Sequence, residues 1–106
     1  MKALLINSLT REITEVEGNF QDYREIAKFL KCEYIEGAHT YDNNDTIFVD
    51  EEGLFNHQGT GFEVADSHQE FFVGNGILVG HTNSGNSRDA KTKIEELKSQ
   101  ITFCYI

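Results

Sequence analysis

The alternation of apolar and polar residues divides the chain into short strand-like runs. Residues 2–6 (KALLI) suit a buried strand, and residues 11–16 (REITEV) predict the returning strand of an N-terminal hairpin. Three more strands are predicted where β-branched and aromatic residues lie between turn-forming Asn, Asp and Gly, over residues 33–41, 45–50 and 76–81.

A first helix is predicted in residues 18–32. Asn19 is the expected N-cap, and Asp22 falls in the first turn, where a carboxylate interacts favourably with the helix dipole. One face of this helix carries apolar residues at helical spacing, namely Phe20, Tyr23, Ile26, Ala27 and Leu30.

A second helix is predicted near the end of the chain. Thr92 and Glu95 form the T-x-x-E pattern of a capping box, so this helix begins near Ala90 or at Thr92. Its apolar stripe consists of Ala90, Ile94, Leu97 and Ile101. Residues 101–106 (ITFCYI) either continue the helix or add a last strand, because they combine β-branched and aromatic side chains.

The remaining segments are turns and one irregular stretch. Residues 50–53 (DEEG) predict a turn in which Gly53 is free to adopt a left-handed conformation. Residues 56–70 hold either a short strand around 62–64 or an irregular loop. The order of elements predicts a single α+β domain over residues 1–106. We expect a mostly antiparallel or mixed sheet of about five to six strands, with two helices packed on one face.

Length and composition agree with one folded domain. The chain has 106 residues, of which 39% are hydrophobic, enough for a modest core without metal or disulfide support. It contains neither a run of ~20 apolar residues nor a signal-peptide pattern, so we expect a cytoplasmic protein with no membrane contact. Cys32 and Cys104 have no metal-binding or redox spacing and are expected to be buried thiols, paired only if the chain is exported.

Charge is distributed unevenly along the chain. The net charge is −9, and no Lys or Arg occurs between Lys31 and Arg88. Such an acidic surface repels nucleic acid and favours basic proteins or cations as partners, although acidic surfaces also simply maintain solubility. The interval holds ten carboxylates: Glu33, Glu36, Asp42, Asp45, Asp50, Glu51, Glu52, Glu63, Asp66 and Glu70.

The glycines in residues 71–80 (FFVGNGILVG) do not form a dinucleotide fingerprint. The spacing of Gly74, Gly76 and Gly80 is one residue longer than G-x-G-x-x-G, and the residues that follow Gly76 predict a strand instead of a helix. Lysine is also absent from the neighbourhood, which excludes a P-loop. We therefore expect these glycines to mark a turn or bulge.

No motif for metal binding or catalysis is present. The four histidines, His39, His57, His68 and His81, are separated by 18, 11 and 13 positions, and none of these spacings matches a helical zinc site. Residues 42–53 place Ile47 where a calcium-binding EF-hand loop requires glycine. Neither G-x-S-x-G nor H-E-x-x-H occurs. We expect no cofactor, no metal site and no enzymatic activity.

Several segments together resemble a known family. The stretches MKALLI, TIFVDEEGLF, GNGILVGHTNSG and TKIEELKSQITF resemble a phage- and plasmid-associated family, domain of unknown function 3846. The resemblance covers nearly the whole chain and is weakest across residues 56–70. It implies a small cytoplasmic accessory protein of a bacteriophage, plasmid or integrated element, and it implies no reaction and no functional residues.

The leading hypothesis is a non-enzymatic protein that binds a basic protein surface, such as the nucleic-acid-binding face of a host or phage protein. It predicts no direct binding to nucleic acid. The contacts are expected in two turns that display their carboxylates together, at Asp42, Asp45, Asp50, Glu51 and Glu52.

Two other classes of function stay open. In the first, Gly74, Gly76, Gly80 and the loop 82–87 line a pocket, together with tyrosines, for a small molecule or a nucleotide-derived signal. In the second, the chain is a structural or regulatory subunit that forms a homodimer through an exposed sheet edge.

Overall fold

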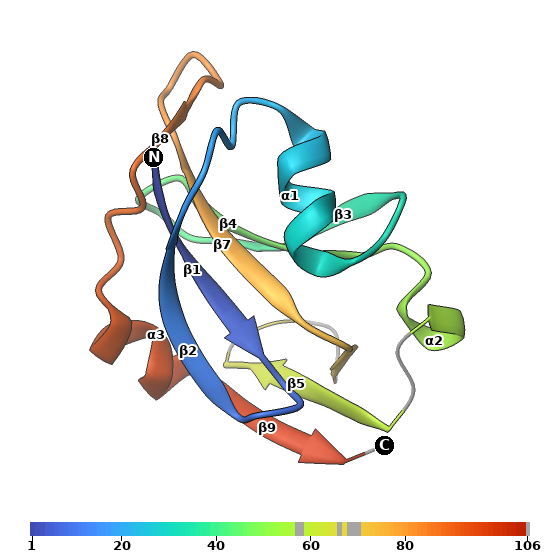
Figure 1. Cartoon of the computed structure of the whole chain (residues 1–106). Coiled ribbons are helices and arrows are strands. Elements are labelled where there is room, and N and C mark those ends of the chain that lie inside the picture. Colours follow the sequence, from blue (N-terminus) through green and yellow to red (C-terminus); the bar gives the residue numbers. More distant parts are fainter. Residues whose placement is uncertain (57–58, 66, 68–70, 106) are drawn as a thin grey trace.

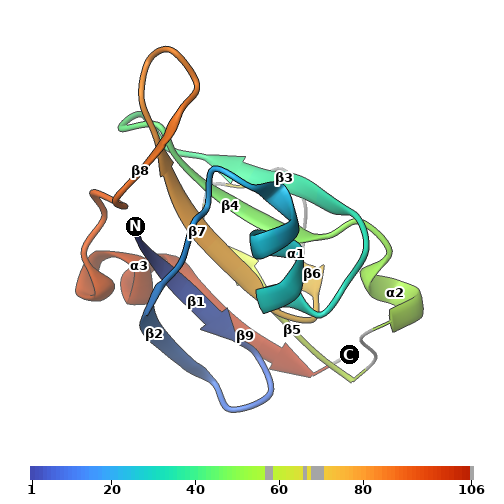
Figure 2. The same cartoon turned by 45° about the horizontal axis from the view of Figure 1, so that its top comes forward.

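The computed structural model describes residues 1–56, 59–65, 67 and 71–105, which form three layers (Figures 1 and 2). The larger sheet contains β1 (Lys2–Asn7), β2 (Glu12–Glu17), β3 (Ile35–Thr40), β4 (Asp45–Asp50), β7 (Gly76–His81) and β8 (Ser87–Arg88). The smaller sheet contains β5 (Thr60–Val64), β6 (Phe72–Val73) and β9 (Ile101–Tyr105). The helices are α1 (Tyr23–Leu30), α2 (Gly53–Asn56) and α3 (Ile94–Gln100).

Every strand pair in the described residues is antiparallel. The larger sheet has the order β2-β1-β7-β4-β3, with β8 paired to β7, so β2 and β3 are its edges. The smaller sheet has the order β6-β5-β9. The coarse α+β prediction is confirmed, and the existence of a second sheet was not predicted.

The larger sheet separates two hydrophobic clusters because successive side chains of a strand point to opposite faces. On one face, Ala3, Ile77 and Val79 pack against Phe20 and Leu30 of the α1 region. On the other face, a second cluster joins the large sheet to the small sheet and α3; its members include Leu4, Ile47, Leu78, Phe62, Phe72 and Leu97. Strands β1 and β7 are buried on both faces, which explains their continuous apolar runs.

The two longer helices lie on opposite sides of the large sheet, so the prediction that both pack on one face is wrong. Helix α1 packs in the first cluster through Ile26 and Leu30, whereas α3 packs in the second through Leu97. Helix α3 leads directly into β9 of the second sheet, which places it on that side of the large sheet. No helix in the described part of the chain is long and apolar enough to cross a membrane.

Helix α1 starts later than predicted. Its N-cap is Asp22, whose side chain accepts a hydrogen bond from the Arg24 backbone N–H at 3.0 Å, so the prediction of Asn19 as N-cap is wrong. Tyr23 is 60% exposed and does not belong to the buried stripe. Phe20 is buried although it precedes the helix, because it packs against Phe29 with ring centroids 5.7 Å apart.

Helix α3 also starts later, at Ile94. The Thr92 hydroxyl donates to the Asp45 carboxylate at 2.6 Å, so it is not the N-cap. Glu96, rather than Glu95, accepts from the Lys93 backbone N–H, at 3.4 Å. The residues from Ile101 onward form β9 against β5, which resolves the open choice between helix and strand.

Candidate binding groove

The turn after β4 is organised by one carboxylate. Asp50 accepts a hydrogen bond from the Glu52 backbone N–H at 2.8 Å and another from the Asn56 side-chain amide at 3.0 Å. The first bond closes an Asx turn, and the second ties the end of α2 to the end of β4. Asp50 is only 5% exposed, so it fixes the local fold.

The single turn of α2 displays two large apolar side chains to solvent. Leu54 is 67% exposed and Phe55 is 82% exposed. Gly53, which begins α2, packs directly on β6: a Cβ atom at this position would lie 2.8 Å from the Val73 carbonyl oxygen. Gly53 does not have a positive φ angle, so the prediction of a left-handed glycine is wrong, and close packing explains this glycine instead.

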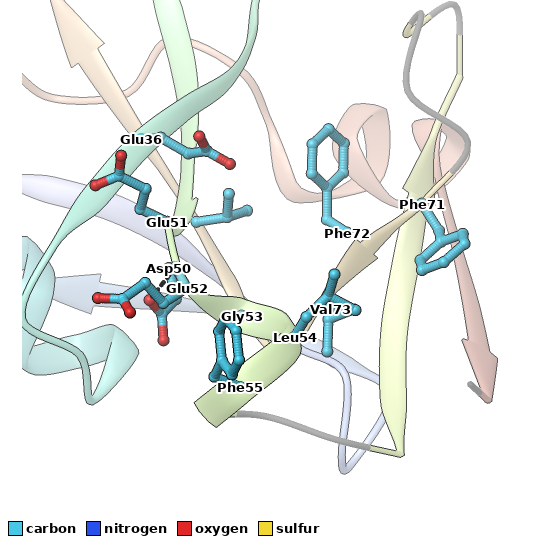
Figure 3. Close-up of a pocket in the computed structure, with 11 residues that line it drawn as sticks. Glu36, Asp50, Glu51, Glu52, Gly53, Leu54, Phe55, Phe71, Phe72 and Val73 are labelled. Carbon is cyan, nitrogen blue, oxygen red and sulfur yellow. Dashed lines mark hydrogen bonds between the residues drawn. The ribbon is translucent and has the colours of Figure 1, made fainter.

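A groove of about 470 Å³ lies between the end of β4, α2 and β6 (Figure 3). Val49 and Phe72 in its lining are buried core residues. In Figure 3 the acidic side chains lie on the β3–β4 side, and Phe71 and Phe72 lie on the β6 side. The complete lining is Glu36, Val49, Asp50, Glu51, Glu52, Gly53, Leu54, Phe55, Phe71, Phe72 and Val73.

The groove is apolar with an acidic border. Its four charged lining residues are Glu36, Asp50, Glu51 and Glu52, and none of the lining residues is basic. Glu36, Glu51 and Glu52 are exposed. Glu52 also borders a neighbouring hollow that contains Lys28 of α1 and Lys31, its C-cap residue. Glu36 and Glu51 are therefore the exposed groove carboxylates that share no described hollow with a lysine.

Asp45 lies in a buried ion pair and does not line the groove. It is fully buried and pairs with Arg88, whose Nη1 lies 3.0 Å from Oδ1. It also accepts hydrogen bonds from the backbone N–H groups of Lys91, at 3.0 Å, and Thr92, at 2.7 Å. Asp45 therefore anchors the segment before α3 to the start of β4.

Gly80 makes this ion pair sterically feasible. It pairs with Asp45 on β4 and with Arg88 on β8, so it lies between the two charged residues across three adjacent strands. A Cβ atom at Gly80 would collide with the Arg88 guanidinium and with the Asp89 carbonyl oxygen. Because Gly80 has no side chain, the Arg88 guanidinium can pass over this position and reach Asp45.

The five predicted contact residues are not displayed together. Asp45 begins β4 and Asp42 lies in the turn before it, whereas Asp50 ends β4 and is followed by Glu51 and Glu52. A six-residue strand separates these ends by about 17 Å. The expectation of one shared surface is wrong, because Asp45 and Asp50 point into the fold. Asp42, Glu51 and Glu52 are exposed, and a role for them in partner binding stays a prediction.

The wider acidic segment is spread over several elements. Its exposed members in the described residues are Glu33, Glu36, Asp42, Glu51, Glu52 and Glu63. Asp66 and Glu70 lie outside the described residues, as do His57 and His68. Among the described hollows, the groove gathers three exposed carboxylates and the exposed side chains of Leu54, Phe55 and Phe71, whereas a neighbouring hollow combines only Glu63 with Phe71.

The glycines of residues 74–80 pack against the protein itself. The space beside Gly76 is filled by the Phe62 ring, whose Cζ would lie 2.7 Å from a Cβ atom there. Gly74 has a φ angle of 89°, in the left-handed region that favours glycine. Gly74 therefore serves the turn before β7, and Gly76 and Gly80 serve close packing.

The described histidines and cysteines are engaged in ordinary packing. His39 stacks edge-on against Tyr41, and His81 against Phe48, with ring centroids 4.6 and 5.9 Å apart. Cys32 and Cys104 are free and only partly buried. Burial, and secondly the charge of Asp50, raise the pKa of the Cys32 thiol to about 11. A thiol with this pKa stays protonated at neutral pH and is a poor nucleophile.

Sequence reasoning found the acidic half of the groove and missed the apolar half. Asp50, Glu51 and Glu52 were predicted contact residues, and all three line the groove. The apolar pairs Leu54-Phe55 and Phe71-Phe72 interrupt an otherwise polar segment, and this was the available signal. Their proximity depends on the pairing of β5 with β6, which the sequence pattern does not reveal.

The chain belongs to the family described as Domain of unknown function (DUF3846), whose model matches residues 1–102. The match confirms the resemblance to this family over nearly the whole chain. Comparison with curated proteins and with solved structures found no match.

Proposed function

We propose that this member of the DUF3846 family is a non-enzymatic binding protein whose groove receives a basic and apolar segment of a partner protein. The observation that carries the proposal is the coincidence of exposed apolar side chains with exposed carboxylates. Leu54 and Phe55 are 67% and 82% exposed, and they share one groove with Glu36 and Glu51. Exposed apolar patches with a polar border are typical of protein-interaction sites.

The acidic border and the apolar lining of the groove would bind different parts of the same ligand. A Lys or Arg side chain has an apolar stem and a charged end, so its methylene groups can cover Phe55 while its charge approaches a carboxylate. Large apolar residues of the same segment would fill the space above Val49 and Phe72. An acidic segment would be repelled, and a purely polar one would leave the apolar lining exposed to water.

The proposal includes a biological context. A small acidic protein of a bacteriophage, plasmid or other mobile element, acting in the cytoplasm, would use such a groove to occupy a basic surface of a nucleic-acid-binding protein. The net charge of −9 supports this context, because it favours encounter with basic surfaces and opposes direct binding to nucleic acid.

Selection from a random displayed peptide library tests the proposal. We expect the enriched peptides to combine Lys or Arg with Leu, Ile, Phe, Met or Trp. Enrichment should disappear on a variant that carries Leu54→Ser and Phe55→Ser. The matched control carries Leu9→Ser and Tyr105→Ser, which removes an equally exposed pair (78% and 77%) outside the groove.

The control variant should enrich the same peptides as the unchanged protein. Enrichment of neutral or acidic peptides, equal enrichment on both variants, or no enrichment at all would each contradict the proposed function.

A further inference from the structure

The groove adjoins an unpaired sheet edge. Glu36, which lines the groove, belongs to β3, and β3 pairs only with β4 in the described part of the chain. The edge therefore lies directly beside the apolar pocket. We infer that the partner segment binds in an extended conformation and adds to β3 as a further strand; this inference rests on the proposed function.

The hydrogen-bond pattern shows which backbone groups of β3 face outward. The Glu51 N–H donates to the Tyr34 carbonyl oxygen at 3.0 Å, which makes Tyr34 and Glu51 a hydrogen-bonded pair. Bonded and non-bonded pairs alternate along an antiparallel ladder, so both backbone groups of Ile35 and the N–H group of Gly37 point away from β4. These groups are the donors and acceptors that an added strand would use. The register of the β3–β4 ladder shifts between Gly37 and His39, so this regular pattern ends at Gly37.

Gly37 leaves this edge open to an approaching backbone. It is exposed, and a Cβ atom there would meet only Thr46 Cγ2, at the ordinary contact distance of 3.7 Å. Its φ angle is outside the left-handed region, so neither packing nor conformation of the free protein requires glycine. The edge also contains no Lys, Arg or Pro, which block edge pairing in many proteins, and the register shift between Gly37 and His39 limits regular pairing to the part of β3 that borders the groove.

Register then links the edge to the groove. Glu36 faces the same side of the sheet as its partner Val49, and both line the groove. An added strand would place one side chain opposite Glu36, where a Lys or Arg is favoured over a carboxylate. Side chains two residues away point to the same face, so apolar residues there would reach the pocket. The fitting ligand thus has basic and large apolar residues two positions apart, on the same face of its strand.

A second copy of the chain is a poorer occupant of the same edge. Pairing of β3 with β3 would bring together two edges that carry Glu36 and no basic residue, and like charges on opposing strands are destabilising. The charge pattern therefore favours a basic partner over a homodimer through β3.

The test uses an acetylated and amidated peptide of about nine residues that repeats Lys-Thr-Leu-Thr, long enough to span an average strand, so that lysine and leucine lie two residues apart on one face. Amide hydrogen exchange is measured on the unchanged protein with and without this peptide at low salt. We expect exchange at Ile35 and Gly37 to slow at least tenfold on binding. Amides in the loop 82–87 serve as the control and should not change.

Two variants at one position give an independent readout. Gly37→Pro removes an outward N–H group without removing a bond to β4, whereas Gly37→Ala keeps that N–H group. We expect the proline variant to bind the peptide at least tenfold more weakly and the alanine variant to bind within about twofold of the unchanged protein. Thermal unfolding establishes whether the proline variant is folded. If it is not folded, the amide exchange of the unchanged protein decides whether the peptide adds to β3.

The outcomes separate the two proposals. If the peptide binds but the Ile35 and Gly37 amides are not protected, strand addition is wrong while the basic-segment function stands. A peptide that fails to bind at low salt would overturn both. Formation of a β3-mediated dimer, seen by sedimentation together with protection of the same amides in the absence of peptide, would also overturn the inference.

Discussion

At the scale of single residues, the carboxylates of the acidic segment have two separate roles. Asp45 and Asp50 are buried and accept hydrogen bonds that hold the chain in place. Glu36 and Glu51 are exposed and line the groove. The distinction matters for mutagenesis, because reversal of the charge of a buried carboxylate damages the fold and reports nothing about a binding surface.

Replacement of Asp45 by alanine should be strongly destabilising. The substitution leaves Arg88, only 19% exposed, without its carboxylate, and it removes the acceptor of the Lys91 and Thr92 N–H groups. Removal of one partner of a buried ion pair typically costs about 3–5 kcal/mol in free energy of unfolding. Urea denaturation measures the loss, with Asp42→Ala as the exposed control, expected within about 0.5 kcal/mol of the unchanged protein. Equal effects of the two substitutions would contradict the anchoring role.

At the scale of elements, the groove is formed where two sheets meet through α2. The Asx turn at Asp50 directs the chain from β4 into α2, and Gly53 lets α2 rest on β6. The exposure of Leu54 and Phe55 follows from this arrangement, since one short turn of helix cannot bury both its inner and outer sides. The groove therefore depends on the position of α2.

Gly53→Ala should displace α2 from β6. The added methyl group would lie 2.8 Å from the Val73 carbonyl oxygen, which belongs to the backbone and cannot rotate away. Overpacking of this kind costs about 1–3 kcal/mol in free energy of unfolding. Gly37→Ala is the matched control, since its methyl group would meet only a side-chain atom at 3.7 Å. Urea denaturation should show a loss for the first variant alone, and no loss in either would show that α2 does not rest closely on β6.

The elements that the sequence pattern predicted best are those set by local periodicity. The hairpin β1–β2, the strands β4 and β7, and the buried face of α1 all lie close to the expected residues. The start of α3 was predicted wrongly because Thr92 is bound by Asp45, a residue 47 positions away. The second sheet was missed for the same reason: β5 pairs with β9, and long-range pairing leaves no mark in local patterns.

The residues of the candidate site can also be divided into features that the sequence shows directly and features that depend on the fold. Charge is a property of composition, so the acidic segment and its avoidance of Lys and Arg could be found directly. Burial is a property of the fold, so the sequence could not separate Asp45 and Asp50 from the exposed carboxylates. Nor could it place Phe71 and Phe72 opposite Glu36 and Glu51, because that neighbourhood depends on how the two sheets pack (Figure 3).

At the scale of the whole molecule, net charge and local groove chemistry act at different ranges. The charge of −9 attracts basic partners from a distance and weakens as salt screens it, within a Debye length of about 8 Å at physiological ionic strength. The groove acts at contact, where Leu54 and Phe55 add an apolar term that salt does not screen. A partner that uses both should bind more weakly at high salt but should not be released completely.

The central claim is that the groove carboxylates, and not the overall charge, select the ligand. The most direct measurement compares two double charge reversals that change the net charge equally. Glu36→Lys with Glu51→Lys changes the groove, whereas Glu12→Lys with Glu15→Lys changes β2 at the opposite edge of the large sheet.

The affinity of each variant for a selected basic peptide is measured by calorimetry at low and physiological salt. We predict a loss of about tenfold or more for the groove variant, equivalent to about 1.4 kcal/mol, and a loss of less than about threefold for the β2 variant. Equal losses in the two variants would show that net charge alone attracts the peptide, and would contradict the assignment of the groove.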